Sequence, residues 1–144
     1  MLKSDFEKHG IVNFTPEEVA HTGAVLGDVQ ARLMIGLQAF RSELGRRVGL
    51  LVNGMTTGDH KAPEHPRGLA ADGFLYPEDG PIYAIDIFKA ALEAGFKGIG
   101  LYWNGVQYSF HLDLRPKYGF WGGTKVVGNK SLGWEYIPLI NDIR

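Results

Sequence analysis

Apolar residues recur at spacings of three or four along two stretches of the chain, which is the period of one face of an α-helix. The longer stripe consists of Val29, Leu33, Leu37, Phe40 and Leu44. It predicts a helix with Asp28 as its N-cap and Gly45 as its left-handed stop. A similar stripe predicts a helix over residues 81–93 that ends at Gly95.

A shorter helix is predicted near the N-terminus from its capping residues. Thr15 is a favourable N-cap, Pro16 suits the first helical position, and Glu18 is placed to complete a capping box. We expect this helix to extend to about His21.

Short apolar runs predict buried strands over residues 48–52 and 69–75. The stretch 53–66 between them is rich in Gly, Thr, Asp and Pro, and it is predicted to be a loop that carries His65.

Asn104-Gly105 is the preferred pair for a two-residue turn and predicts a hairpin. In that hairpin Trp103 pairs with Val106 and Gly98 pairs with His111. Side chains alternate between the two faces of a strand, so one face is apolar and consists of Ile99, Leu101, Trp103, Val106, Tyr108, Phe110, Leu112 and Leu114. The other face consists of Gly98, Gly100, Tyr102, Gln107, Ser109, His111, Asp113 and Arg115. Its two glycines are expected to leave open space beside His111 for a ligand.

The length of 144 residues and the hydrophobic fraction of 44% predict one domain over residues 1–144. We expect an α+β fold, with helices packed on one side of a small, mainly antiparallel sheet and a core over about 13–121. Gly122, Gly123 and Gly128 predict an irregular C-terminal segment over 122–144.

The charge and the absence of cysteine restrict the partners and the chemistry. A formal net charge of −1 gives no basic footprint, so no nucleic-acid partner is expected. With no cysteine, a metal must be held by His, Asp and Glu. The chain has neither an apolar run long enough for a membrane span nor the apolar segment of a signal peptide, so a soluble protein, cytoplasmic at synthesis, is expected. We also expect a monomer.

His65, Asp72 and His111 together offer a three-ligand metal site. Two neutral imidazoles and one carboxylate suit Zn²⁺, and catalytic zinc sites keep a fourth position open for water. Taken singly, the three residues are more simply a surface loop histidine, a turn-capping aspartate and a hydrogen-bonded sheet histidine.

The motifs His65-x-x-Gly68-x-Ala70-x-Asp72 and His111-x-Asp113-x-Arg115 resemble those of the hedgehog / D-alanyl-D-alanine zinc metallopeptidase superfamily. The resemblance runs from Asn13-Phe14 to about Trp121. It implies a hedgehog/DD-peptidase-like fold, Zn²⁺ bound by His65, Asp72 and His111, and a peptidoglycan stem peptide with D-amino acids as substrate. The implied activity is that of a carboxypeptidase or an endolysin-type endopeptidase, encoded by a phage or prophage, which reaches the cell wall if it is released.

Asp113 is a catalytic candidate with two open roles. It is either the general base for the attacking water or an acceptor that orients the ring of His111. Many members of the superfamily supply the base from a Glu or His just before the last metal ligand, where this chain has Tyr108, Ser109 and Phe110. Glu64 is therefore a reserve candidate.

Arg115 is the second catalytic candidate, as a group that binds a substrate carboxylate or the oxyanion; the alternative is a surface salt bridge. The superfamily carries a Ser-Gly-Tyr-Arg-like element after the buried strand, where this chain has Asn53-Gly54-Met55-Thr56. Without that arginine the chain must use Arg67 or Arg115, bind its substrate differently, or be catalytically weak.

Tyr102 and Trp121 are expected to line a peptide groove, or else to be core aromatics. Two other functions stay open for the whole chain. One is a zinc-containing cell-wall-binding or structural module with weak or no turnover, and the other is a metal-free wall-binding domain.

Overall fold

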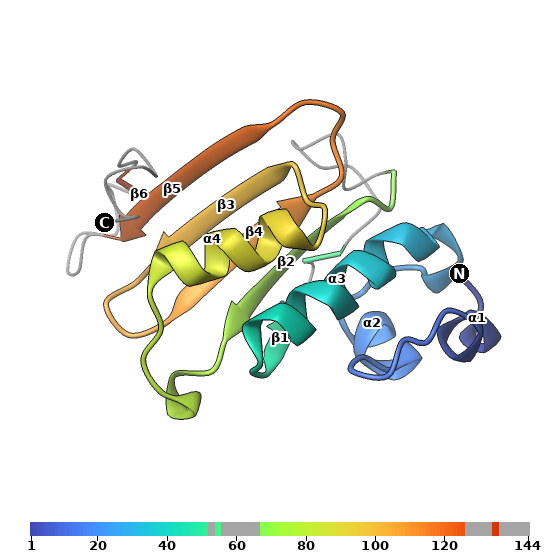
Figure 1. The fold of residues 1–144 in the computed structure, drawn as a ribbon. Coiled ribbons are helices and arrows are strands. Elements are labelled where there is room, and N and C mark those ends of the chain that lie inside the picture. Colours follow the sequence, from blue (N-terminus) through green and yellow to red (C-terminus); the bar gives the residue numbers. More distant parts are fainter. Residues whose placement is uncertain (52–53, 56–66, 126–133, 136–144) are drawn as a thin grey trace.

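The computed structural model describes residues 1–51, 54–55, 67–125 and 134–135 (Figure 1). Four α-helices are present in these residues: α1 (Lys3–Lys8), α2 (Pro16–His21), α3 (Ala31–Leu44) and α4 (Ala84–Glu93). The strands are β1 (Val48–Leu50), β2 (Ala70–Leu75), β3 (Gly98–Trp103), β4 (Tyr108–Asp113), β5 (Gly119–Lys125) and β6 (Trp134–Glu135). Short 3₁₀ turns occur at η1 (Leu26–Asp28) and η2 (Pro77–Asp79).

The strands form one mixed sheet in the order β1-β2-β4-β3-β5-β6. All neighbours are antiparallel except β3 and β5, which are parallel. Helices α3 and α4 lie next to each other across one face of the sheet, and α1 and α2 lie beside the β1 side of the molecule (Figure 1). The predicted α+β fold with a mainly antiparallel sheet is therefore confirmed.

The core lies between α3, α4 and the apolar face of the sheet. Phe40 of α3 meets Phe110 of β4 edge to face, with ring centroids 5.2 Å apart, and both rings are fully buried. On α4, Phe88 meets Phe120 of β5 at 4.9 Å. These contacts place the odd-numbered residues of β3 and the even-numbered residues of β4 and β5 toward the helices, as the alternation predicts for β3 and β4.

The predicted helices are present, with two corrected starts. The helix predicted over 81–93 begins at Ala84. Thr15 and Glu18 form the predicted capping box of α2, and Gly45 ends α3 at φ 67°. The N-cap of α3 is Gln30 instead of Asp28, which belongs to η1. The backbone N–H of Gln30 donates to the carbonyl of Gly68 at 3.1 Å. This hydrogen bond to Gly68, just before β2, keeps residues 28–30 from continuing α3 toward the N-terminus.

The hairpin register differs from the prediction by two residues. Trp103 pairs with Tyr108, and Gly100 instead of Gly98 pairs with His111. The connection is longer because the side-chain oxygen of Asn104 accepts from the backbone N–H groups of Val106 and Gln107, at 2.9 and 2.7 Å. Such a turn centred on an asparagine side chain replaces the predicted two-residue turn. Because the shift is even, every residue keeps its predicted face.

Strands β5 and β6 and helix α1 were not predicted. Residues 122–125, expected to be irregular, belong to β5, which runs parallel to β3 with Gly122 beside Leu101. Glycine-rich sequence gives little strand signal, and this pairing depends on contact with a distant part of the chain. Helix α1 was also missed; it buries Phe6 and little else.

Candidate metal centre

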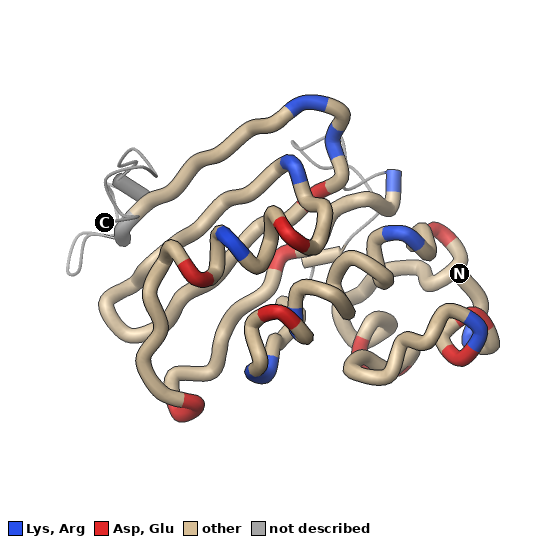
Figure 2. The backbone as a smooth tube through the Cα atoms, in the orientation of Figure 1, with Lys and Arg blue, Asp and Glu red and all other residues tan. Residues whose placement is uncertain are grey.

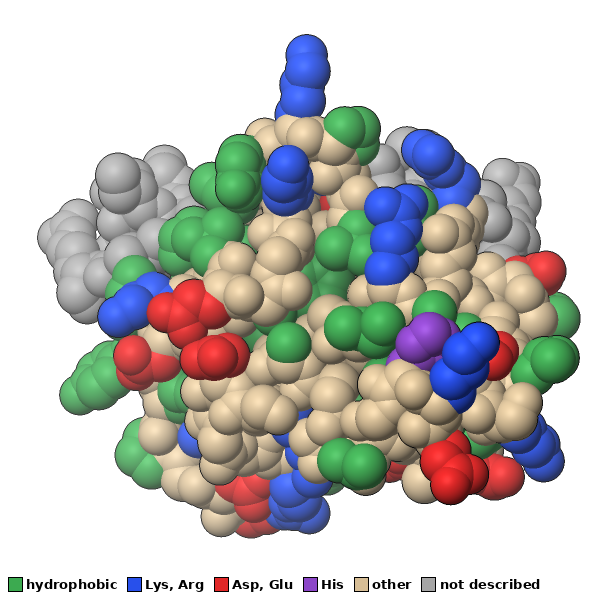
Figure 3. Space-filling model, turned by 45° about the vertical axis from the view of Figure 1, so that its right-hand side comes forward, with side chains coloured by type: hydrophobic (Ala, Val, Ile, Leu, Met, Phe, Trp, Pro, Cys, Tyr) green, Lys and Arg blue, Asp and Glu red, His purple; other side chains and the backbone are tan. Residues whose placement is uncertain are grey.

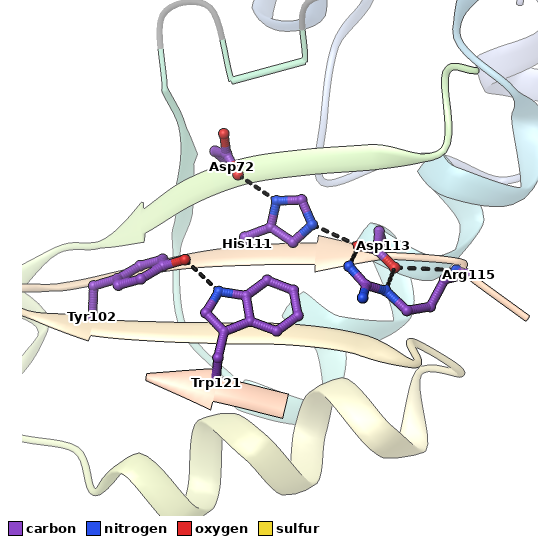
Figure 4. Close-up of polar contacts among 6 residues, drawn as sticks. All are labelled: Asp72, Tyr102, His111, Asp113, Arg115 and Trp121. Atoms are coloured by element: carbon purple, nitrogen blue, oxygen red, sulfur yellow. Dashed lines mark hydrogen bonds and ion pairs between the residues drawn. The ribbon is translucent and has the colours of Figure 1, made fainter. Parts of the chain in front are cut away.

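Asp72 and His111 are direct cross-strand partners on the face of the sheet opposite α3 and α4. Asp72 lies on β2 and His111 on β4, and the antiparallel pairing places them opposite each other. The Oδ1 atom of Asp72 is 2.9 Å from Nδ1 of His111 (Figure 4). Two of the three predicted metal ligands therefore meet, although they are 39 residues apart in the sequence.

Asp113 contacts the second ring nitrogen of His111. It lies two residues beyond His111 and so projects from the same face of β4. Its Oδ2 atom is 2.6 Å from Nε2 of His111, and its side chain is fully buried. The ring of His111, only 6% exposed, is thus placed between two carboxylates.

Arg115 holds Asp113 by a bidentate ion pair. Its Nε donates to Oδ1 of Asp113 at 2.8 Å, and Nη2 donates to Oδ2 at 2.6 Å. The backbone N–H of Arg115 also donates to Oδ1, at 3.1 Å. Both oxygens of Asp113 are therefore engaged, which favours the orienting role over the role of general base. Arg115 therefore forms a salt bridge, as in the alternative given for it above, and the pair is partly buried instead of lying at the surface.

Trp121 of β5 completes the wall of the site. Its ring lies 5.2 Å from the ring of His111, and the guanidinium carbon of Arg115 lies 4.9 Å from the Trp121 centroid. Its Nε1 donates to the hydroxyl of Tyr102 (Figure 4). Trp121 and Tyr102 therefore support each other as one aromatic unit beside the imidazole.

The two glycines of β3 do not leave open space, contrary to the prediction. A Cβ on Gly98 would overlap the carboxylate of Asp113 and the Nε of Arg115. A Cβ on Gly100 would overlap the indole of Trp121. The glycines are required because large side chains from β4, β5 and the segment after β4 lie directly across β3. The Gly-x-Gly alternation marks the place where side chains cross β3. For Gly100 the crossing side chain is Trp121 of β5, a strand that was not predicted from the sequence.

Electrostatics within the cluster favour a charged imidazole when no metal is bound. Burial lowers the pKa of His111, but the hydrogen bonds to Asp113 and Asp72 outweigh that effect and raise it to about 9. Burial raises the pKa of Asp113, and the hydrogen bonds from Arg115 and His111 reverse this and hold it well below its usual range. Arg115 and His111 thus favour the anionic form of Asp113.

The remaining predicted residues are placed only in part. His65 and the reserve base Glu64 lie outside the described residues. Arg67 is exposed at the start of β2, where its carbonyl accepts from the side chain of Gln30. Among the described residues, no group of three or more His, Cys, Asp and Glu side chains is arranged to hold a metal ion.

The donors that meet at Asp72 and His111 fit zinc in their chemistry, because an imidazole nitrogen and a carboxylate oxygen are both zinc ligands. Their 2.9 Å separation is that of an ordinary hydrogen bond, so a metal would have to replace the proton between them. Asp113 on the far nitrogen is the carboxylate–histidine arrangement that commonly orients a metal-binding ring. A third protein ligand must come from elsewhere, and His65 stays the prediction for it.

No family model matches the sequence, and neither the curated proteins nor the solved structures include a match. Among the described residues, no helix is long and apolar enough to cross a membrane.

Proposed function

We propose that this protein is a zinc-dependent peptidase that hydrolyses peptidoglycan peptides containing D-amino acids. The observation that carries the proposal is the placement of His111 between Asp72 and Asp113 on the face of the sheet opposite α3 and α4. The resemblance of the two sequence motifs supports it, because the charged and histidine motif residues that the structure describes, Asp72, His111, Asp113 and Arg115, are those that meet.

Each side chain has a definite role in this proposal. Asp72 and His111, through its Nδ1, hold the metal together with His65. When bound, Zn²⁺ supplies Lewis-acid activation of water and of the scissile carbonyl. Asp113 accepts the Nε2 proton of His111 and fixes which nitrogen is free to bind the metal. Trp121 and Tyr102 form a wall that excludes water from one side of the ring.

The alternative is a zinc-containing wall-binding module that has little or no turnover. The observation that favours it is that Asp113 and Arg115 are bound to each other by both oxygens and two nitrogens. Neither is then placed to act as base or to bind the oxyanion. A peptidase must take its base from another residue, for which Glu64 stays the candidate.

Metal analysis followed by wall digestion tests both functions. Purified protein should contain one zinc per chain, and His65→Ala, Asp72→Ala and His111→Ala should each lose it. The zinc-loaded protein should release peptides from purified peptidoglycan, with the new ends identified by mass. Stoichiometric zinc without release from several wall chemotypes would support the module, and full zinc retention in any of the three variants would remove that residue from the site.

A further inference from the structure

A groove runs along the edge of the sheet at β1. This strand is first in the sheet order, and among the described strands only β2 pairs with it. The groove has a volume of about 710 Å³, and its lining consists of Gly49, Leu50, Leu51, Phe74 and Tyr76 from the sheet side and Thr15, Glu17, Glu18 and His21 from the side of α2. Gly49 and Leu51 belong to one face of β1 and Leu50 to the other. Because residues of both faces line the groove, it lies at the edge of the strand and not over one face.

The backbone of Leu50 offers a donor and an acceptor to this groove. The N–H of Leu51 donates to the carbonyl of Asp72 at 3.1 Å, so these two residues form a hydrogen-bonded pair of the ladder. Such pairs alternate along antiparallel strands with pairs that exchange no bonds. Leu50, opposite Gly73, therefore directs its N–H and C=O away from β2. Among the described residues, no group outside the ladder bonds to either of them.

One wall of the groove is aromatic. The ring of Phe74 lies across Gly49, where a Cβ would overlap it. Phe74 and Tyr76 meet edge to face, with ring centroids 5.1 Å apart. Both side chains are half-buried, so they present apolar surface to the groove. An apolar side chain placed against this pair would be removed from water, which is favourable.

The other wall, formed by α2, is acidic. Glu17 and Glu18 are exposed, and α2 contains neither Lys nor Arg (Figure 2). Glu17 lies 3.6 Å from Nζ of Lys3, but the two side chains are 71% and 77% exposed, and such a pair is weak. Glu18 uses Oε2 for its capping bond to the N–H of Thr15. Figure 3, which brings the side with α1 and α2 forward, shows acidic side chains in small, separate groups, so the negative charge at the groove is local.

We propose that the edge of β1 binds an extended segment of a partner protein as an added strand, with basic side chains toward α2 and apolar side chains toward Phe74 and Tyr76. In this mode of recognition backbone bonds to the strand edge provide affinity, and the walls beside it select side chains. Side chains of an added strand alternate between two directions, which matches one acidic and one aromatic wall. The segment should therefore alternate basic and apolar residues. A volume of about 710 Å³ is in the range of sites that hold a short stretch of peptide.

This site is separate from the proposed peptidase function and needs no metal. The twist that lets a new strand follow β1 comes from L-residues. Peptidoglycan stem peptides contain D-amino acids, so they are poorly suited to continuous pairing along this edge. The partner at β1 is thus an ordinary polypeptide and not the proposed substrate.

The test uses the full chain and the synthetic peptide Thr-Val-Lys-Val-Lys-Val-Thr with blocked ends. Dissociation constants are measured by calorimetry at low ionic strength. Two controls carry the same charge: one has the order Thr-Lys-Lys-Val-Val-Val-Thr, and the other has a D-valine at the centre. Each should bind about 10-fold more weakly, as expected for the loss of one or two hydrogen bonds and the contacts beside them.

N-methylated peptides identify strand pairing in particular. One version is methylated at the nitrogens of all three valines and the other at those of both lysines. Backbone N–H groups of alternate residues point to opposite edges of a strand. Only one of the two versions should therefore lose affinity, by about 10-fold or more. Equal affinities of the two versions would overturn the proposal.

Variants of the chain test each part of the groove. Leu50→Pro removes the outward N–H of β1, at a position where an edge strand tolerates proline, and should weaken binding by about 10-fold. Glu17→Gln/Glu18→Gln keeps a capping side chain and should weaken binding by about 5-fold. The matched control Asp86→Asn/Glu93→Gln removes two charges from α4 and should bind like the parent protein. His111→Ala should also bind like the parent, whether or not the protein proves to be a peptidase.

Hydrogen exchange of the Leu50 amide measures the pairing without any substitution, and it decides the matter if Leu50→Pro does not fold. With about 90% of the protein in the complex, this exchange should slow by about 10-fold, whereas exchange at Leu51, already bonded to Asp72, should change little. No saturable binding up to ~1 mM peptide, equal binding of the D-valine or reordered peptide, or unchanged exchange at Leu50 would overturn the proposal. Self-association that protects Leu50 without peptide, detected by sedimentation at rising protein concentration, would also overturn it, because a second copy would then occupy the edge.

Discussion

The two faces of the central strands β2, β4 and β3 are stabilised in different ways. The face toward α3 and α4 is filled by Ile99, Phe110 and Leu112, which are fully or almost fully buried and interact by shape alone. The opposite face is filled by directional bonds that connect Asp72, His111 and Asp113. Apolar packing tolerates a change of shape better than a buried ion pair tolerates the loss of one partner. Substitutions on the two faces should therefore separate stability from metal binding.

The largest expected effect on stability is on the apolar face. Leu112→Ala should lower the free energy of unfolding by about 3 kcal/mol, because it removes a fully buried side chain and leaves a cavity. Zinc affinity should stay within about a factor of two of the affinity of the parent protein. It is measured by competition with a chelator, at a temperature where the variant is folded. A large loss of zinc affinity would show that the two faces are coupled.

On the polar face, Asp113→Asn should mainly change metal binding. We expect zinc affinity to fall by ~10–100-fold, because the orienting acceptor on Nε2 of His111 is weakened. Stability of the metal-free protein should fall by about 2 kcal/mol, since Arg115 loses its charged partner but is partly solvated. Excess zinc should restore any peptidase activity. Unchanged zinc affinity together with lost turnover would instead identify Asp113 as the base.

Gly100→Ala tests the close packing across β3. The new Cβ would overlap the indole of Trp121, so stability should fall by about 1–2 kcal/mol and the Trp121 fluorescence should change. The matched control is Gly27→Ala, where a Cβ meets open space. If Gly100→Ala is as stable as the parent, the indole does not lie where the structure places it.

The pH dependence of zinc affinity tests the charge on His111. An imidazolium cannot bind a metal, so below a pKa of about 9 zinc must displace a proton from His111. Apparent affinity should rise about 10-fold per pH unit, or 1.4 kcal/mol, between pH 7 and 8. The slope is measured by chelator competition in buffers of constant ionic strength. If zinc affinity does not change with pH in this range, then His111 is either not a zinc ligand or not protonated in the metal-free protein.

The smallest effect is predicted away from both faces. Thr15→Ala removes the capping bond to the backbone of Glu18 and should cost about 1 kcal/mol. Zinc affinity and wall digestion should not change. A change in zinc affinity or in digestion would mean that α2 is energetically coupled to the site through contacts other than those described.

The sequence predicted most of the elements from local patterns and missed what depends on distant contacts. The capping box at Thr15 and the stop at Gly45 are local chemistry and are confirmed. The proximity of Asp72 and His111 was also predicted, because both were taken as ligands of one metal site on the strength of the two motifs. The position of β5 was not, since parallel pairing joins segments without a turn that marks it. For that reason the space beside His111 was expected to be open, whereas Trp121 fills it.

The even length of the shift in the β3–β4 connection has a consequence for how this chain can vary. Adding or removing two residues within Asn104–Gln107 would slide the register but return every side chain to its own face. A slip by one residue would exchange the faces and bury His111 and Asp113 among the helices, so the buried apolar face holds the register against it. Insertions at this connection should therefore be taken up as a longer loop, which makes it a suitable place for a tag or a linker.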